Sequence, residues 1–262
     1  MTMAVHNLLA LHDIVLNQSR LTQIKRDELA PLLKQPNALT QYADTLIQQQ
    51  NQQLLSNTIT SAQALSQVIH RIIVQLNQSK KYLGQKKYNF IQRWLGIDLE
   101  QQVGSLQYLN ELNALIDEAA LLGHRVATEI HQSQENLQSL HDLRTEMAHY
   151  VVAAEQFLLE IDQFAKQQYL DDFKPRIQKK INTLMTSQTA TDLAMLQMQL
   201  SQNVAMTILD RFNDFFFFFF PAWQQHVFNL QSVQTPQELQ RLNEARERLI
   251  QTLDHAIKSA NN

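Results

Sequence analysis

A seven-residue repeat runs through the middle of the chain and constrains the fold more than any other feature. Between residues 102 and 170, two sets of positions recur with this period. The first set is Leu109, Ile116, Gly123, Ile130, Leu137, Arg144, Val151 and Leu158, and the second is Leu112, Ala119, Val126, Ser133, Leu140, Met147, Ala154 and Ile161. Thirteen of the sixteen are apolar, which is typical of a long helix that supercoils against its neighbours. Gly123 is a candidate bend in this helix.

The rest of the chain is also expected to be helical. It has only four Gly and five Pro in 262 residues, whereas sheets need many tight turns built from these residues. Apolar patterns predict further helices over about 4–30, 38–79 and 176–220, with Pro175 as a boundary, and a last helix that begins at Thr235-Pro236. The sequence therefore predicts an all-α protein, an elongated antiparallel bundle of long coiled-coil-like helices. We expect residues 1–36 to form an N-terminal helical arm and residues 37–262 to form the bundle.

Composition narrows the classes of function. The formal net charge is −3, so we expect no general attraction to nucleic acid. The chain contains no Cys, which excludes disulfides and thiolate sites within it. The first ten residues lack the basic segment and apolar core of a secretory signal, and no run of about 18 apolar residues is present. These features predict a cytoplasmic protein.

Catalytic and metal-binding motifs are sparse. Glu146 and His149 form one E-x-x-H pair, whereas a di-iron bundle needs two such pairs and two further Glu. His124 and His131 are one heptad apart, about 10 Å along a helix, which is too far for one metal ion. The sequence has no phosphate-binding loop, nucleophile elbow or H-E-x-x-H motif. We therefore expect no catalytic residue, metal or cofactor, and hence no enzyme. A metal site that uses Glu146 and His149 is a weaker alternative.

A basic and aromatic segment lies between residues 80 and 94. Its candidate contact residues are Lys80, Lys81, Lys86, Lys87, Arg93 and Trp94. A second group of cations is Lys174, Arg176, Lys179 and Lys180. Such groups can contact phosphates or anionic lipid headgroups. The competing interpretation is a helical turn with buried aromatic rings and solvated lysines.

Six consecutive phenylalanines interrupt the regular pattern of the C-terminal half. The candidate contact residues are Phe215, Phe216, Phe217, Phe218, Phe219, Phe220, Pro221 and Trp223. A helix with Phe on every side cannot leave half of them in water without cost, because burying each ring is worth roughly 2–3 kcal/mol. The run is either buried where several helices meet, or a surface that contacts a partner or a membrane, or an artefact of low complexity.

The residues around this run resemble a known family. The matching features are Leu200, Gln202-Asn203, Asp210-Arg211, Phe212-Asn213 and Phe220-Pro221-Ala222-Trp223. Asn243-Glu244, Leu249-Ile250 and Thr252-Leu253 are similar to the family's closing helix. With these features, residues 40–258 resemble the toxic-anion (tellurite) resistance proteins of the TelA-like family. The resemblance implies an intracellular helical protein linked to resistance against tellurite and other toxic or envelope stresses. It supplies no catalytic residues.

The sequence thus predicts a non-enzymatic stress-resistance scaffold that acts through protein partners, with contact at the inner membrane surface as a further expectation. The rival interpretation is an α-helical pore-forming toxin component that inserts its Phe-rich segment into a membrane. The identity of the partners and the oligomeric state are left open.

Overall fold

Helices make up the secondary structure that the computed structural model describes, which covers residues 8–55, 59–83, 97–163 and 167–230 and positions 237, 240–241, 244–248, 250–252 and 254. The predicted all-α bundle is therefore confirmed. The chain divides into two compact units. Unit 1 comprises residues 1–58 and 132–200, and unit 2 comprises residues 59–131 and 201–262. The arm boundary at residue 36 stays a prediction, and the described residues on both sides of it lie in unit 1.

Two long helices contribute residues to both units. They are α6 (Ile97–Glu160) and α7 (Gln167–Asp214). All sixteen positions of the seven-residue repeat are buried or half-buried, so the predicted seam is confirmed. α6 is one continuous helix through Gly123, and a bend at that position stays a prediction. The helix boundary expected at Pro175 is wrong. Pro175 lies inside α7 with its side chain exposed, between the buried Phe173 and Ile177 that hold this turn in the core.

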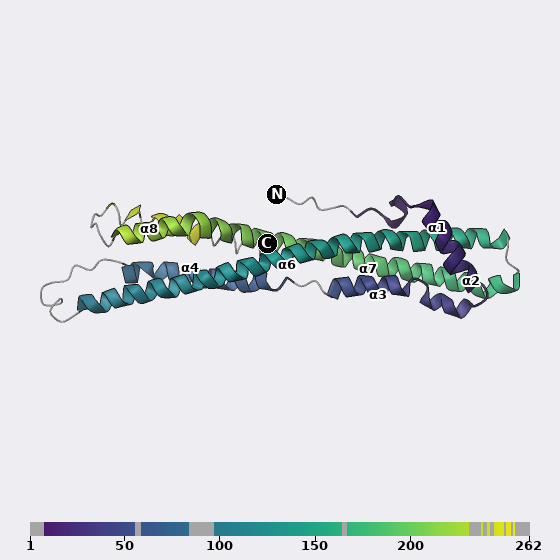
Figure 1. Cartoon of the computed structure of the whole chain (residues 1–262), viewed down its shortest axis with the longest axis horizontal. Helices are drawn as coiled ribbons and strands as arrows, with labels where there is room; N and C mark the ends of the chain where they lie inside the picture. The colour runs from purple at the N-terminus through teal and green to yellow at the C-terminus, as the bar shows by residue number, and fades with distance from the viewer. Residues whose placement is uncertain are drawn as a thin grey trace. The chain divides into compact units, whose positions relative to one another are not determined.

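Unit 1 combines the N-terminal segment with the second half of α6 and the first part of α7 (Figure 1). Its shorter elements are η1 (Leu11–Asp13), α1 (Gln18–Ile24), η2 (Lys25–Leu29), α2 (Ala30–Leu32), η3 (Pro36–Gln41), α3 (Asp44–Leu55) and η4 (Ile161–Gln163). The single helix expected over 4–30 is wrong, because residues 14–17 are not helical. Asn17 begins α1, since its side chain accepts a hydrogen bond from the Ser19 N–H at 2.9 Å.

Contacts in unit 1 show the directions of its long helices. Arg144 of α6 meets Asp192 of α7, and Phe157 lies 6.1 Å from Phe173 between ring centroids. Residues later in α6 therefore meet residues earlier in α7, so the two run antiparallel. The contacts Asp44–Lys180 and Gln50–Gln188 advance together along α3 and α7, so these two helices run parallel.

Unit 2 is built from α4 (Ser61–Leu83), the first half of α6, the end of α7, η5 (Phe215–Phe219), α8 (Phe220–Leu230) and described C-terminal residues. The helix expected over 38–79 is therefore two helices, α3 and α4. Glu129 of α6 accepts hydrogen bonds from the Ser61 backbone N–H at 3.0 Å and hydroxyl at 2.7 Å. A carboxylate at this end satisfies free N–H groups and complements the helix dipole, which explains why α4 begins there. The predicted helix start at Thr235-Pro236 lies outside the described residues.

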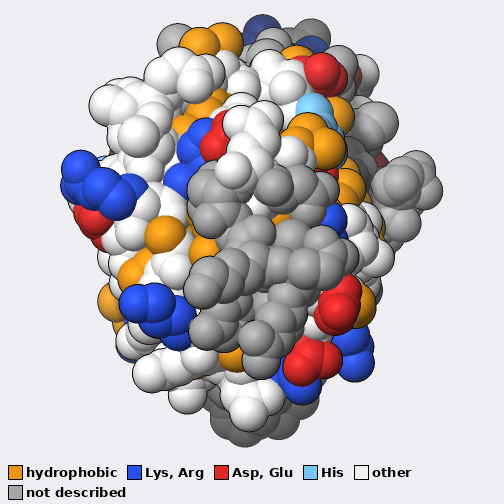
Figure 2. Space-filling view, turned by 90° about the vertical axis from the view of Figure 1, so that its right-hand side faces the viewer, with side chains coloured by type: hydrophobic (Ala, Val, Ile, Leu, Met, Phe, Trp, Pro, Cys, Tyr) orange, Lys and Arg blue, Asp and Glu red, His pale blue; other side chains and the backbone are white. Residues whose placement is uncertain are grey.

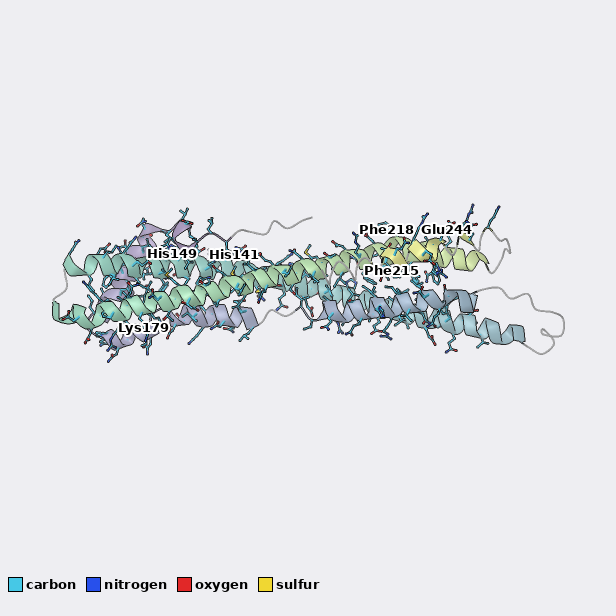
Figure 3. All side chains as sticks on the ribbon, turned by 180° about the vertical axis from the view of Figure 1, so that it is seen from behind. His141, His149, Lys179, Phe215, Phe218 and Glu244 are labelled. Carbon is cyan, nitrogen blue, oxygen red and sulfur yellow. The ribbon has the colours of Figure 1, made fainter. Side chains whose placement is uncertain are left out.

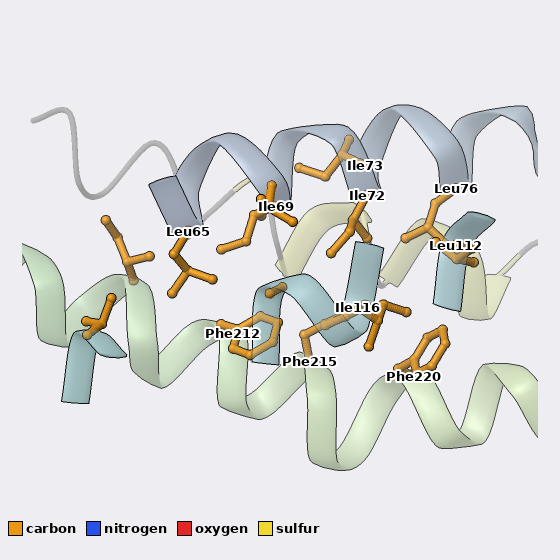
Figure 4. Close-up of a cluster of buried hydrophobic side chains, with 14 of the residues drawn as sticks. Leu65, Ile69, Ile72, Ile73, Leu76, Leu112, Ile116, Phe212, Phe215 and Phe220 are labelled. Carbon is orange, nitrogen blue, oxygen red and sulfur yellow. The ribbon is translucent and has the colours of Figure 1, made fainter. Parts of the chain in front are cut away.

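The core of unit 2 is aliphatic on one side and aromatic on the other (Figure 4). Arg71 pairs with Glu118, and Gln75 bonds Glu111, so α4 runs antiparallel to α6. Across these two helices lie the phenylalanines that follow α7. The labelled core side chains are Leu65, Ile69, Ile72, Ile73, Leu76, Leu112, Ile116, Phe212, Phe215 and Phe220.

Candidate functional site

The phenylalanine run forms a π-helix with an inner and an outer face. Phe215 is fully buried, and Phe220 and Trp223 are buried close behind it. Phe217 and Phe218 are 64% and 72% exposed, and Phe216 is half-buried. Figure 3 labels Phe215 and Phe218 on this segment. The structure therefore combines two of the expected interpretations: part of the run is core and part is surface.

A proline explains the π-helix. Pro221 has no N–H for the carbonyl of residue 217, and its ring would crowd that carbonyl in a regular α-helix. In the widened turn, the Phe220 N–H bonds the Phe215 carbonyl five residues back. The other described π-helix, η2, has the same spacing, because it ends two residues before Pro31. Pro175, by contrast, lies in a regular turn of α7, so a proline alone does not predict a widened turn.

The widened turn decides which rings enter the core. In a regular α-helix, residues five apart point about 140° away from each other. Here Phe215 and Phe220 lie on one face, with ring centroids 5.6 Å apart, and Phe220 stacks on Trp223 at 5.9 Å. Two rings between them, Phe217 and Phe218, are turned outward. Among the described side chains of the run, Phe217 and Phe218 are the most exposed. Contact of the run with a partner or a membrane stays a prediction.

The other residues of the family-like stretch surround this run. Gln202 and Phe212 are buried in unit 2, so they serve packing. Arg211 and Asp214 form a 3.9 Å ion pair on the surface, with both side chains about half exposed. Such an exposed pair stabilises little. The stretch before the run thus combines buried packing residues with one exposed ion pair.

The basic and aromatic segment cannot be placed, because residues 84–96 and the side chains of Lys80 and Lys81 lie outside the described residues. The second basic group is described. Arg176 bonds Asn37, and Lys180 bonds both the Thr40 carbonyl and Asp44. These cations tie α7 to the N-terminal segment. On the face drawn in Figure 2, Lys and Arg side chains are interspersed with Asp and Glu, and hydrophobic side chains lie in separate small patches.

Glu146 and His149 lie together in unit 1. Their side chains bond residues 17–20 near the N-terminus and do not form a metal site. Arg20 bonds Glu146 through its Nε at 2.9 Å and also through a terminal nitrogen. The Asn17 backbone N–H donates to His149 Nε2 at 3.0 Å, and His149 Nδ1 lies 2.9 Å from the Thr145 carbonyl. Because Nε2 accepts, Nδ1 carries the proton and donates to that carbonyl.

Both ring nitrogens of His149 are thus engaged, and the one ring lone pair, on Nε2, is not free for a metal. The described part of the chain holds no group of three or more His, Asp or Glu placed to bind a metal ion. None of the described helices is long and apolar enough to cross a membrane.

Sequence reasoning missed a tyrosine network beside this pair. Tyr42 donates to the Tyr150 carbonyl at 2.7 Å, and Tyr150 donates to Glu28 at 2.7 Å. Burial raises the pKa of Tyr42 well above its ordinary value, and nearby Glu28 raises it further. Burial likewise raises the pKa of Tyr150. No spacing in the sequence pairs these residues, since 108 positions separate the two tyrosines.

A buried polar chain crosses unit 1, and here the sequence did contain a signal. Arg144 stands at a core position of the seven-residue repeat, where a charge requires a partner. Its guanidinium bonds both carboxylate oxygens of Asp192 at 2.9 and 3.0 Å, and also the Leu9 carbonyl. Gln188 donates to Asp192 at 2.6 Å and accepts from Gln50 at 2.8 Å. These hydrogen bonds link α3, α6, α7 and the backbone at Leu9 in one layer.

The comparisons with known proteins point to a distant relative. No family model matches the sequence, and no solved structure matches it. A search of curated proteins finds the Escherichia coli protein KlaA, which is 23% identical over 250 residues. The aligned region covers 92% of this chain and 97% of KlaA. The chain is therefore similar to KlaA over nearly the whole length of both proteins.

Proposed function

We propose that this chain is a non-enzymatic helical scaffold in resistance to tellurite and related toxic or envelope stresses. We further propose that it works in the cytoplasm by binding a partner protein through Phe217 and Phe218. The observation that carries the proposal is the exposure of these two rings, 64% and 72%, on a turn whose rings Phe215 and Phe220 are buried. Tellurite is named as the stress because residues 200–223 resemble the TelA-like family.

The physical argument starts from the cost of leaving aromatic rings in water. Large apolar side chains exposed side by side are typical of contact surfaces, and aromatic residues dominate the energetics of such surfaces. The turn that displays Phe217 and Phe218 is held from behind by Phe215, Phe220 and Trp223, all buried in one core. A display this rigid loses little entropy when a partner binds.

The hydrogen bonds of the described polar groups also support a scaffold. The buried Arg144–Asp192 pair and the Glu146–His149 pair are both saturated by bonds that hold helices together. Each therefore has a structural use. Binding through a displayed apolar surface needs none of these groups to act on a substrate.

The experiment uses the native host with its gene deleted. The strain is challenged with tellurite and with envelope-active antibiotics, and it is complemented with the wild type or with the double variant Phe217→Ser/Phe218→Ser. We expect the deletion to lower tolerance and the double variant to fail in restoring it. The matched control is Leu159→Ser, because Leu159 is 79% exposed in unit 1 and lies far from the run in the sequence. Unchanged tolerance after deletion would contradict the proposed role.

Two biochemical measurements distinguish partner binding from membrane insertion. Pull-down from the host with wild type, double variant and Leu159→Ser should yield a partner that only the double variant loses. Circular dichroism checks that the double variant keeps its helices. Leakage from liposomes that depends on Phe217 and Phe218 would instead favour the pore-forming alternative.

A further inference from the structure

The segment that precedes α1 in unit 1 buries little apolar surface. In residues 9–17, which we call the N-terminal strap, Leu11 is buried, Ile14 and Leu16 are half-buried, and Val15 is 95% exposed. The regular structure of the strap is the three-residue η1. A segment with so few buried apolar contacts opens more easily than the long helices beside it. The polar contacts of the strap with α6 therefore matter for its attachment.

Among the described residues, three polar contacts join the strap to α6, and they are Leu9–Arg144, His12–Glu155 and Asn17–His149. The His12–Glu155 pair is solvated, with side chains that are 49% and 35% exposed, so it stabilises little. His149, by contrast, is 7% exposed, and its Nε2 accepts the Asn17 N–H at 3.0 Å (Figure 3). The hydrogen bond to His149 is therefore the contact whose loss would affect the strap most through burial.

The Asn17–His149 bond exists only while the imidazole ring is neutral. Nε2 accepts from the Asn17 N–H, while Nδ1 carries the ring proton and donates to the Thr145 carbonyl. A proton added to Nε2 removes its lone pair and sets two N–H groups against each other. An N–H group that loses its acceptor away from water is costly. Protonation of the ring therefore favours a strap that moves away and lets water reach both groups.

The charged groups on the strap side of the ring belong to α6 and α1. The Glu146 carboxylate lies 3.6 Å from His149 Nδ1 and is bound by Arg20. The carboxylate favours a protonated ring and the guanidinium opposes it. Because Glu146 stands at the Nδ1 side, it does not replace the acceptor that Asn17 loses at Nε2. Among the described residues, the hydrogen bonds and ion pairs of the ring are with Asn17, Thr145 and Glu146.

The titratable groups farther from the ring have partners of their own. Tyr150 donates to Glu28 of η2, and Tyr42 donates to the Tyr150 carbonyl. Both tyrosines stay neutral in acid, since burial raises the pKa of each. On α7, no charged residue lies between Lys180, which pairs with Asp44 of α3, and Asp192, which pairs with Arg144.

We propose that His149 is an acid-sensitive latch for the N-terminal strap. At neutral pH the unprotonated ring holds the Asn17 N–H, and the strap lies on α6. When the pH falls through the range in which histidine titrates, the ring gains a proton, the bond is lost and the strap detaches. Detachment ends at α1, because Leu21 and Ile24 are buried in the core of unit 1. The latch does not depend on the proposed stress-resistance role or on the phenylalanine run.

Hydrogen exchange of the full chain at about pH 7.5 and about pH 5 tests the latch, with protection factors that correct for the pH dependence of intrinsic exchange. We expect peptides from residues 9–20 to lose protection roughly tenfold in acid, while α6 in unit 1 keeps its protection. His149→Gln should lose less than about twofold, because the Gln side-chain oxygen can accept near the place of Nε2 and takes up no proton.

The matched control is His12→Gln, which removes the other histidine contact of the strap. A protonated His12 strengthens its pair with Glu155, so this variant should release the strap in acid at least as much as the wild type does. Circular dichroism checks that both variants stay helical. Acid release of equal size in His149→Gln and the wild type overturns the proposal, as does acid release that only His12→Gln abolishes.

A second measurement needs the wild type and covers the case in which His149→Gln frees the strap at every pH. NMR of the chain with labelled histidines follows ring protonation, and the His149 signal is the one that is missing from the spectrum of His149→Gln. We expect the strap to lose protection over the same pH range in which this ring gains its proton. A strap that detaches while His149 is neutral, or stays attached after His149 is protonated, overturns the latch.

Discussion

Arg144 in unit 1 and Gly123 in unit 2 occupy the same position of the seven-residue repeat, three repeats apart. Each replaces an apolar residue, but the two solve opposite packing problems. Arg144 reaches from α6 to Asp192 of α7 and forms two hydrogen bonds with its carboxylate. Gly123 has no side chain, and a Cβ built on it would lie 3.4 Å from the ring of Phe212 on the same helix α7. In unit 1, α6 and α7 are joined by a buried charge. In unit 2, the same two helices are joined by the close approach of an aromatic ring to a glycine.

The difference teaches how one long helix can specify two kinds of core. An apolar core stabilises but tolerates several registers, because hydrophobic contacts are not directional. A buried ion pair adds little stability, yet its hydrogen bonds are lost if the helices slide. We infer that the polar layer of Arg144, Asp192, Gln188 and Gln50 sets register in unit 1. In unit 2 the core is apolar, with aliphatic side chains packed against the aromatic rings.

The largest effect is expected in the aromatic core. Phe212→Ala removes a ring that is 2% exposed and leaves a cavity over Gly123, so it should lower the free energy of unfolding by about 3–5 kcal/mol. Urea denaturation followed by circular dichroism measures the loss. Phe218→Ala removes an exposed ring of the phenylalanine run that follows α7 and should cost less than about 0.5 kcal/mol. Equal losses would show that the buried and the exposed rings of this region do not differ in their contribution to stability.

The polar layer should respond next most strongly. Arg144→Ala leaves Asp192 without its guanidinium partner and should lower the free energy of unfolding by about 3 kcal/mol. Hydrogen exchange should locate the loss in unit 1. The double variant Arg144→Leu/Asp192→Leu removes both charges and should recover most of that loss. If the double variant is as unstable as the single one, the ion pair itself contributes strongly to stability. That result would contradict the view that it mainly sets the register of the helices.

Alkaline pH tests the buried hydroxyl groups of the two units. In the folded chain the pKa of Tyr42 in unit 1 and that of Tyr108 in unit 2 are both raised, chiefly by burial. The folded state therefore keeps a proton that the unfolded state releases near pH 10. The stabilisation is present in full below about pH 10 and is lost above it, by up to about 1.4 kcal/mol per pH unit for the deeply buried Tyr42. Urea midpoints measured between pH 8 and 11 record this loss.

The tyrosine variants separate the two units in that experiment. Tyr42→Phe and Tyr108→Phe should each flatten the alkaline decline by a similar amount, because burial raises the folded-state pKa of both tyrosines. A decline that is the same in the wild type and in both variants would assign the pH dependence to other groups.

The smallest effect is expected at Gly123. Alanine has a higher helix propensity than glycine by about 1 kcal/mol, and the added Cβ would make ordinary contacts at 3.4–3.5 Å with Phe212 and Leu209. Gly123→Ala should therefore raise the free energy of unfolding slightly, by less than about 1 kcal/mol. Gly123→Val should lower it, because the larger side chain displaces the ring. A clear loss of thermal stability in Gly123→Ala would mean that the helices approach more closely than the contact distances indicate.

The sequence predicted much of the fold because long-range periodicity survives in a helix. The sixteen repeat positions, fifteen in α6 and Ile161 in η4, are buried or half-buried as expected, since a seven-residue period keeps one stripe facing the neighbouring helices. Boundaries were harder. Pro175 was expected to end a helix, but buried neighbours on both sides keep α7 continuous. Residues 38–79 carry a helical pattern on both sides of a break that depends on Glu129, which is 68 positions away from Ser61.

The candidate site was predicted in outline only. Six phenylalanines before Pro221 identified an irregular segment, but the sequence does not say which rings are buried. That depends on the widened turn and on the helices packed against it. Likewise, the E-x-x-H spacing of Glu146 and His149 left a metal pair as a weaker alternative, and the sequence did not show that these side chains bond Arg20 and Asn17.

By itself the sequence determined that this protein is all-helical, that α6 presents one continuous seam, and that Arg144, Ser133 and Gly123 interrupt it. These are local and periodic properties, encoded by helix propensity and by the spacing of apolar residues. Only the tertiary structure decided what meets each interruption: Asp192 at Arg144 and Phe212 at Gly123. It also decided that Phe217 and Phe218 are exposed. The reason is physical, because burial depends on neighbours brought from distant parts of the chain, and periodicity along one helix does not name them.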